Sequence, residues 1–132
     1  MSISTQVLIV GGGPIGLTAS IALSRFGIDS VLVNERSTTS HHPRARFIDV
    51  RTIEILRQLD VADAVIDIGL PPEWVESVRY STTWAEPEVF RLLTESYHSV
   101  PRATSPTIPV MTSQDLVEPI LLDAASSGTI KP

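Results

Sequence analysis

The chain has 132 residues, 42% of them hydrophobic and 19% charged, which is typical of a single soluble globular domain. Its formal net charge of −5 argues against nucleic acid as its main partner. The sequence has no Cys, which excludes disulfides, thiolate metal sites and cysteine nucleophiles, and it has no apolar run long enough to span a membrane. We therefore expect a cytoplasmic domain without a secretion signal.

A strand, a glycine-rich turn, a helix and a second strand are predicted between residues 6 and 36. The first strand, Val7–Val10, is a short apolar run stopped by glycine, which predicts burial on both faces. The helix is predicted over Ile15–Phe26 and ends at Gly27. Its apolar residues recur at helical spacing: Ile15, Ala19, Ala22, Leu23 and Phe26. The second strand is predicted over Ile28–Val33.

The turn after the first strand carries the spacing G-x-G-x-x-G, formed by Gly11, Gly13 and Gly16. In a dinucleotide site the first glycine permits the tight turn, the second lets the backbone approach a pyrophosphate, and the third lets helix and strand pack closely. The start of the helix, with Pro14 and Ile15, supplies free N–H groups and the positive end of the dipole. The turn therefore predicts a phosphate-binding site.

Glu35 follows the second strand, about 20 residues past the turn, where a carboxylate accepts hydrogen bonds from a ribose diol. The same carboxylate repels a 2′-phosphate, so an adenosine without one is favoured. A glycine triplet alone is often only a flexible loop. Here it stands in the order strand, turn, helix, strand and acid, which favours a site for FAD or another dinucleotide.

Five arginines crowd into the segment after the motif: Arg36, Arg44, Arg46, Arg51 and Arg57. Arginine side chains there are well suited to bidentate hydrogen bonding with phosphate oxygens. The alternative is a solvated helix face with ion pairs of Glu54 to Arg51 and Arg57. We expect Arg44, on a loop, to face a ligand, and Arg57 and Arg51 to lie on the helix face. The neighbouring His41 and His42 have no third ligand at a useful spacing, so no metal site is predicted.

The next elements are a loop over residues 37–43, a helix from about Val50 with core residues at Ile53, Leu56 and Leu59, and a second helical piece over Val61–Ile68 that ends at Gly69. Two or three antiparallel strands are predicted within residues 73–94, because β-forming residues alternate there.

An extended connection over residues 95–110 precedes a predicted capping box at Thr112-Ser113-Gln114-Asp115. The helix that it opens ends at residues 126–128, and residues 129–130 resemble the start of another strand. The core face of this helix is predicted from its apolar spacing to consist of Leu116, Val117, Ile120, Leu121 and Ala124.

Four stretches in this order resemble the N-terminal part of the class A (single-component) flavoprotein monooxygenases, in the branch of the phenol and aromatic polyketide hydroxylases. They are V-L-I-V-G-G-G-P-I-G-L, V-L-V-N-E-R, H-P-R-A-R-F-I-D-V-R-T-I-E-I-L-R and Q-D-L-V-E-P-I-L. The third stretch is the most specific, and Gln114-x-x-x-Glu118-Pro119 in the fourth adds weight. The resemblance covers essentially the whole chain.

The resemblance implies an α/β, Rossmann-like FAD-binding fold of the glutathione-reductase type, with a small antiparallel sheet inserted at about residues 73–94. It places the FAD pyrophosphate at the turn Gly11–Gly16 and the ribose on Glu35. It places Arg36 at the adenine end, and Arg44 and Gln114 near the cofactor. The implied activity is NAD(P)H- and O₂-dependent hydroxylation of a small aromatic substrate.

Members of this family are several times longer, so residues 1–132 are expected to be the N-terminal part of one FAD-binding domain, and the remainder of the same polypeptide is an expected partner. No catalytic residue is assigned. Two alternatives stay open: a stand-alone, non-catalytic dinucleotide-binding module, and an NAD-linked dehydrogenase with a Rossmann domain. The dehydrogenase explains residues 7–35 equally well, but not Gln114 or the loop Pro43-Arg44-Ala45.

Overall fold

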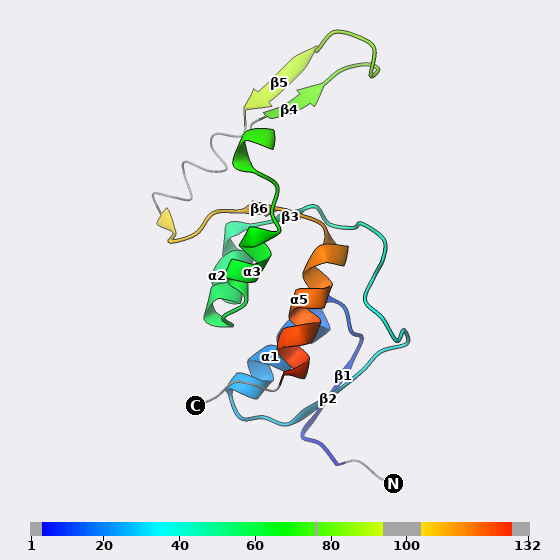
Figure 1. Cartoon of the computed structure of the whole chain (residues 1–132), viewed down its shortest axis with the longest axis vertical. Coiled ribbons are helices and arrows are strands. Elements are labelled where there is room, and N and C mark those ends of the chain that lie inside the picture. Colours follow the sequence, from blue (N-terminus) through cyan, green and yellow to red (C-terminus); the bar gives the residue numbers. More distant parts are fainter. Residues whose placement is uncertain (1–3, 76, 94–103, 128–132) are drawn as a thin grey trace.

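The computed structural model describes residues 4–75, 77–93 and 104–127, and the predicted strand at residues 129–130 lies outside them. Its helices and strands alternate in an α/β arrangement, which confirms the predicted fold class (Figure 1). In chain order the elements are β1 (Val7–Val10), α1 (Pro14–Arg25), β2 (Ser30–Val33), β3 (Phe47–Ile48), α2 (Val50–Gln58), α3 (Ala62–Asp67), a 3-10 turn (Pro72–Trp74), β4 (Ser77–Tyr80), β5 (Phe90–Leu93), β6 (Val110–Met111) and α5 (Gln114–Ser126).

The predicted βαβ unit is present. β1 and β2 pair in parallel, with Val7 opposite Ser30 at the start of the pair and Val10 opposite Val33 at its end. The prediction that β1 is buried on both faces is wrong, because Leu8 and Val10 are 60% and 80% exposed. Successive strand side chains point to opposite faces, and within the described residues α1 covers only one face of this two-stranded sheet.

Helix α1 ends where the sequence predicts. The N–H of Gly27, just past the helix, donates to a carbonyl group of the last turn at 3.0 Å. Its core contacts differ from the apolar repeat that defined the helix. Leu17 and Ile21 are buried, whereas Ile15 and Phe26 are 87% and 80% exposed. The spacing of apolar residues therefore located the helix but did not identify the residues that it buries in the core.

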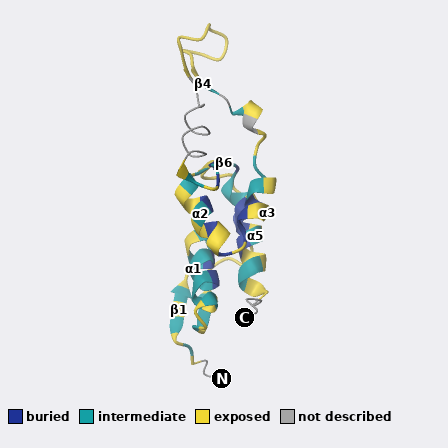
Figure 2. Cartoon of the chain, turned by 90° about the vertical axis from the view of Figure 1, so that its left-hand side faces the viewer, coloured by how far each residue is buried: buried dark blue, intermediate teal, exposed yellow. Residues whose placement is uncertain are grey.

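The hydrophobic core lies between helices α1, α2, α3 and α5, where Figure 2 shows the buried residues concentrated. Helices α1 and α5 lie side by side, and α2 and α3 pack next to them (Figure 1). Ile53, Leu56 and Leu59 are buried, as predicted. On α5, Val117 and Leu121 are buried, but the predicted core residue Leu116 is 50% exposed. No described helix is long and apolar enough to cross a bilayer.

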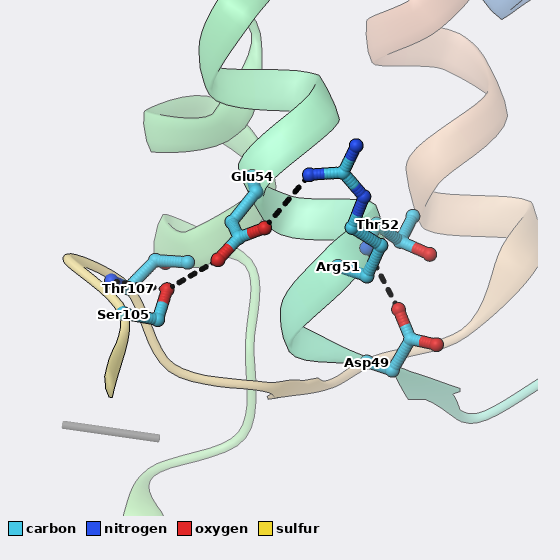
Figure 3. Close-up of polar contacts among 6 residues, drawn as sticks. All are labelled: Asp49, Arg51, Thr52, Glu54, Ser105 and Thr107. Carbon is cyan, nitrogen blue, oxygen red and sulfur yellow. Dashed lines mark hydrogen bonds and ion pairs between the residues drawn. The ribbon is translucent and has the colours of Figure 1, made fainter. Parts of the chain in front are cut away.

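Polar contacts fix the start and the outer face of α2 (Figure 3). Asp49 caps the helix by accepting from the backbone N–H of Thr52 at 2.7 Å. The expected pair of Arg51 with Glu54 forms, with Nη1 and Oε2 3.0 Å apart. The other carboxylate oxygen of Glu54 accepts from the hydroxyl of Ser105 at 2.8 Å, instead of pairing with the next arginine of the helix. α2 is thereby tied to the segment that precedes β6.

Strands β4 and β5 form the predicted antiparallel insertion, with Ser77 opposite Leu93 and Tyr80 opposite Phe90. This hairpin projects from the helices at the end of the molecule opposite β1 and β2 (Figure 1). The rings of Tyr80 and Phe90 pair across the two strands, with their centroids 5.7 Å apart. The hairpin is therefore held mainly by its own ladder.

A short antiparallel pair that the sequence did not predict joins the middle of the chain to α5. Phe47 of β3 lies opposite Met111 of β6. The contact continues beyond the strands, because the N–H of Gln114 donates to the carbonyl oxygen of Arg44 at 2.9 Å. The extended connection predicted for residues 95–110 lies outside the described residues up to residue 103. The pair brings the Arg44 loop against the start of α5.

The capping box predicted at the start of α5 is wrong. The N-cap is Ser113, and its side chain makes no capping hydrogen bond. Its hydroxyl donates instead to Asp115 Oδ1 at 2.5 Å. The hydroxyl of Thr112 donates to the carbonyl oxygen of Ile68 at 3.3 Å. Tertiary contacts and a competing local hydrogen bond have taken the groups that a capping box would use.

Candidate functional site

The glycine turn has the geometry that its spacing predicts. Gly11 has a φ of +114°, a conformation that side chains other than glycine rarely adopt. Its N–H donates to the carbonyl oxygen of Val33 at 2.8 Å, so the turn leaves from the end of the β1–β2 ladder. A Cβ on Gly16 would overlap the carbonyl oxygen of Gly11 and would lie 3.3 Å from Ile9 Cγ2. Glycine at these two positions is a requirement of the turn itself.

Gly13 has a different reason to be glycine. It is the N-cap of α1, in an extended conformation that any residue adopts, and it makes no side-chain capping bond. A Cβ on Gly13 would approach only one described atom within 4 Å, Glu118 Oε1 at 4.0 Å. The space over this residue is therefore open, next to the unpaired N–H groups of the first turn that begins at Pro14. This arrangement fits an anionic group such as a pyrophosphate.

Asn34 joins the glycine turn to the end of β2, and the sequence analysis missed it. Its side-chain oxygen accepts from the N–H of Gly12 at 3.0 Å, and its amide nitrogen donates to the carbonyl oxygen of Arg36 at 2.9 Å. These bonds fix the backbone on either side of Glu35. A signal was available, because a short polar residue between a strand and the predicted ribose acid is well placed to bind backbone groups.

Glu35 and Arg36 follow the carboxyl end of β2, and both side chains are exposed. Within the described part of the chain, no hydrogen bond or ion pair engages the Glu35 carboxylate. Both strands of the parallel pair end at this edge, which is where ligands bind in open α/β sheets. Glu35 is thus free to accept hydrogen bonds from a diol.

Arg44 and Gln114, which are far apart in the sequence, meet through the backbone bond described above. The Arg44 side chain is exposed, and the Gln114 side chain is partly buried. Gln114 Nε2 donates to Glu118 Oε1 at 2.5 Å. Because the Glu118 carboxylate also lies beside Gly13, it connects Gln114 to the open side of the glycine turn.

Glu118 is the second residue that the sequence analysis missed as a site residue. Its side chain is buried, with 3% of the residue exposed. Its Oε2 accepts from the backbone N–H of Ser40 at 2.6 Å, and its Oε1 accepts from Gln114. The motif Gln114-x-x-x-Glu118 contained the signal, since residues four apart share one face of a helix.

A family model described as "FAD binding domain" matches residues 4–131. The match includes the glycine turn, Asn34, Glu35, the Arg44 loop and α5. The chain belongs to the FAD binding domain family.

Relatives of this chain include a phenol monooxygenase and an aklavinone hydroxylase. The chain is 36% identical over 132 residues to phenol 2-monooxygenase of Pseudomonas sp. (strain EST1001), covering 96% of this chain and 22% of that protein. It is 39% identical over 131 residues to aklavinone 12-hydroxylase RdmE of Streptomyces purpurascens, covering 91% of this chain and 23% of that protein. These relatives confirm the resemblance to the class A aromatic hydroxylases.

Solved structures agree with the sequence relatives. The flavin-dependent monooxygenase PieE, in complex with FAD and substrate, matches with a TM-score of 0.87 and 39% identity, over 98% of this chain and 23% of that one. Aklavinone-11 hydroxylase, in a ternary complex with FAD and aklavinone, matches with a TM-score of 0.84 and 28% identity, over 98% of this chain and 25% of that one. The chain spans about a quarter of the length of these relatives.

The loop before Arg44 also carries two histidines, His41 and His42. His41 and His42 are exposed, and the nearest polar contact of His41 is the Thr38 hydroxyl at 3.5 Å from Nε2. Among residues 4–75, 77–93 and 104–127, no three acidic or histidine side chains are grouped closely enough to hold a metal ion.

Proposed function

We propose that this chain is the FAD-binding segment of an NAD(P)H- and O₂-dependent monooxygenase that hydroxylates an aromatic, phenolic or polyketide, substrate. The observation that carries the proposal is the glycine turn, in which Gly11 and Gly16 are required by the fold while Gly13 faces open space. The named hydroxylases among its relatives support the assignment of reaction class.

The residues at the carboxyl ends of β1 and β2 fit the adenosine diphosphate half of FAD. The free N–H groups at the start of α1, next to Pro14, would donate to the pyrophosphate, and the helix dipole favours its charge. The Glu35 carboxylate would accept hydrogen bonds from the ribose diol, and Arg36 would lie at the adenine end. The Asn34 bonds hold these two positions in register with the turn.

Gln114 and the Arg44 loop would contact the cofactor beyond its pyrophosphate. Their backbone bond places both beside the first turns of α5, which packs along α1. The Ile15 side chain, 87% exposed on the first turn of α1, adds an apolar surface next to the same site. Bound FAD supplies the electron transfer and oxygen activation, whereas the protein binds it, orients it and limits access of water.

NAD(P)H as the reductant, a small aromatic molecule as the substrate and the rest of the same polypeptide as the partner are parts of this proposal. The length of the relatives supports the last, because this segment spans about a quarter of them. No described group is assigned to catalysis. A cytoplasmic location stays a prediction from the sequence.

The test is an absorbance spectrum of the purified chain before and after incubation with FAD and desalting, with circular dichroism to show that the chain is folded. Retained flavin absorbance is the expected result. NAD, added in the same way, is the comparison that separates an FAD site from the Rossmann domain of a dehydrogenase.

A folded chain that retains NAD but not FAD would contradict the proposal. The matched control is Gly13→Val, which places a side chain in the open space over the turn and should abolish retention without unfolding the protein. In the intact polypeptide that contains this segment, phenolic substrates should stimulate NAD(P)H oxidation, and the same substitution should remove that stimulation.

A further inference from the structure

Glu118 is a buried carboxylate whose position the proposed function does not explain. It lies on the second turn of α5, with 3% of the residue exposed, and no ion pair neutralises it within the described residues. Its Oε1 is 4.0 Å from the point that a Cβ on Gly13 would occupy, next to the predicted pyrophosphate site. Burying an acid beside an anion site is costly unless hydrogen bonds within the protein replace those lost to water.

The first bond of Glu118 determines how the Gln114 amide is oriented. Both carboxylate oxygens of Glu118 accept hydrogen bonds, so the –NH₂ group of Gln114 faces Glu118 Oε1, at 2.5 Å. The amide oxygen of Gln114 is then directed away from Glu118 and remains an acceptor. A glutamine free to flip would present either a donor or an acceptor.

The second bond of Glu118 fixes the loop that leads to Arg44. Its Oε2 accepts from the buried backbone N–H of Ser40 at 2.6 Å, which is a short bond. The carbonyl oxygen of Arg44 accepts from the N–H of Gln114. The segment from Ser40 to Arg44 is therefore held at both ends by the first turns of α5.

We propose that Glu118 is a positioning residue of the FAD site. It locks the Gln114 amide so that its oxygen accepts from a hydroxyl or N–H donor of the cofactor, and it clamps the loop of residues 40–44 against α5. This inference rests on the proposed function for the identity of the ligand. The hydrogen-bond network itself is independent of that function.

The two hydrogen bonds at position 118 require a glutamate, and a glutamine could not accept both of them. Two donors, the Ser40 N–H and the Gln114 amide, approach two different oxygens of Glu118. A glutamine side chain has the same shape but only one acceptor oxygen, so one of these donors would face an –NH₂ group. Glu118→Gln thus removes one bond with little change in volume.

The experiment combines nuclear magnetic resonance of the FAD-free chain with FAD titration of wild type and Glu118→Gln. The Ser40 amide proton should resonate far downfield in the wild type, because its bond to the carboxylate is short, and it should move upfield in the variant. FAD binding should weaken by roughly tenfold or more, the usual loss for a hydrogen bond to a charged group. Glu54→Gln removes the same charge on α2, where Glu54 contacts Ser105 and Arg51 (Figure 3), and should change neither quantity.

Gln114→Ala completes the test. If Glu118 acts through Gln114, Glu118→Gln should lose most of its effect on FAD affinity in the Gln114→Ala background. An equal fold-loss in both backgrounds overturns the proposal, as does an unchanged Ser40 resonance in folded Glu118→Gln. Should Glu118→Gln fail to fold, Gln114→Ala alone is decisive, because unchanged FAD affinity in that variant overturns the proposal. Failure of the wild type to bind FAD, with the Ser40 resonance as expected, would instead contradict the proposed function.

Discussion

The glycine-turn region and the β4–β5 hairpin lie at opposite ends of the molecule and are stabilised in different ways (Figure 1). In the first, α1 packs against both strands and against α5, and Leu17 and Ile21 are buried. In the second, the strands pair with each other, and Val78, Tyr80 and Phe90 are 42–55% exposed. Figure 2 shows the same contrast, with buried residues between the helices and an exposed hairpin.

Both regions were found from local sequence signals, but those signals do not report tertiary burial. Alternation and turn residues are sufficient to define a hairpin. Burial needs a second element to pack on the first, and among the described residues no other element packs extensively on the hairpin. Substitutions in the helical region should consequently reduce stability, and substitutions at the glycine turn should weaken ligand binding. Substitutions in the hairpin should change neither quantity much.

The largest expected effect separates binding from folding within the glycine turn. Gly13→Val should abolish FAD binding, because the side chain fills the open space over the turn, while the melting temperature stays close to that of the wild type. Gly16→Val should lose binding and fold together, since its Cβ overlaps the Gly11 carbonyl oxygen. FAD titration and thermal denaturation of both variants measure this difference. An unstable Gly13→Val would show that the space is needed by the fold.

The second prediction compares the same substitution in the two regions. Leu17→Ala should reduce the free energy of unfolding by about 2–5 kcal/mol, because the side chain is fully buried between α1 and its neighbours. Leu92→Ala, in a hairpin position that is 41% exposed, should cost less than about 1 kcal/mol. Urea denaturation measures both. Equal losses would mean that the hairpin packs on something within the intact protein.

The third prediction concerns the acid after β2. Glu35→Ala should weaken FAD binding by about 1.5–3 kcal/mol, because it removes hydrogen bonds to a charged acceptor. Its exposed side chain has no partner in the described residues, so stability should not change. Isothermal titration with FAD measures the affinity. The matched control is Glu86→Ala, an exposed acid in the loop between β4 and β5, which should bind FAD normally.

A smaller effect is expected at the start of α2. Hydrogen bonds from the hydroxyl and backbone N–H of Thr52 hold the pKa of Asp49 below its ordinary value. The ionised carboxylate therefore stabilises the folded chain above that ordinary pKa, and the contribution is lost as the pH falls through the lowered pKa. Asp49→Ala should cost about 1 kcal/mol at pH 7 and less in acid. Denaturation of the wild type and the variant at several pH values tests this prediction. A difference in unfolding free energy that does not change with pH would show that the ionised form of Asp49 does not stabilise the helix.

The smallest effect is expected in the hairpin. Glu88 accepts hydrogen bonds from Arg91 at 2.8 Å and 2.9 Å, and Arg91, followed by Arg79, holds the pKa of Glu88 below its ordinary value. The groups are exposed, where ion pairs contribute little because water and salt screen them. Glu88→Gln should leave the melting temperature unchanged within error, at low and at high salt. A clear salt-dependent loss would show that this network is desolvated in the intact protein.

The sequence located most of the site's backbone. The spacing of Gly11, Gly13 and Gly16 predicted the turn, and Glu35 was placed correctly at the end of β2. These predictions succeeded because each depends on a few neighbouring residues with strong conformational preferences. The proposed contacts of these residues with FAD stay predictions.

The missed residues depend on contacts between distant segments. Asn34 binds Gly12, and Glu118 binds Ser40 across most of the chain, so the local signals at these two residues did not show which distant group each would bind. The capping box failed for the same reason, because the Thr112 hydroxyl is bonded to Ile68. The exposed face of β1 was mispredicted because an apolar run does not show whether other elements cover both faces of the sheet.

The sequence by itself determined the order of elements, the glycine turn and, through its resemblance, the FAD family. Only the tertiary structure decided that β3 pairs with β6, that Arg44 meets Gln114, and that Glu118 is buried beside Gly13. The physical reason is the distance along the chain over which each effect acts. Backbone preferences act over a few residues, whereas the burial of a carboxylate depends on which helices and loops pack around it.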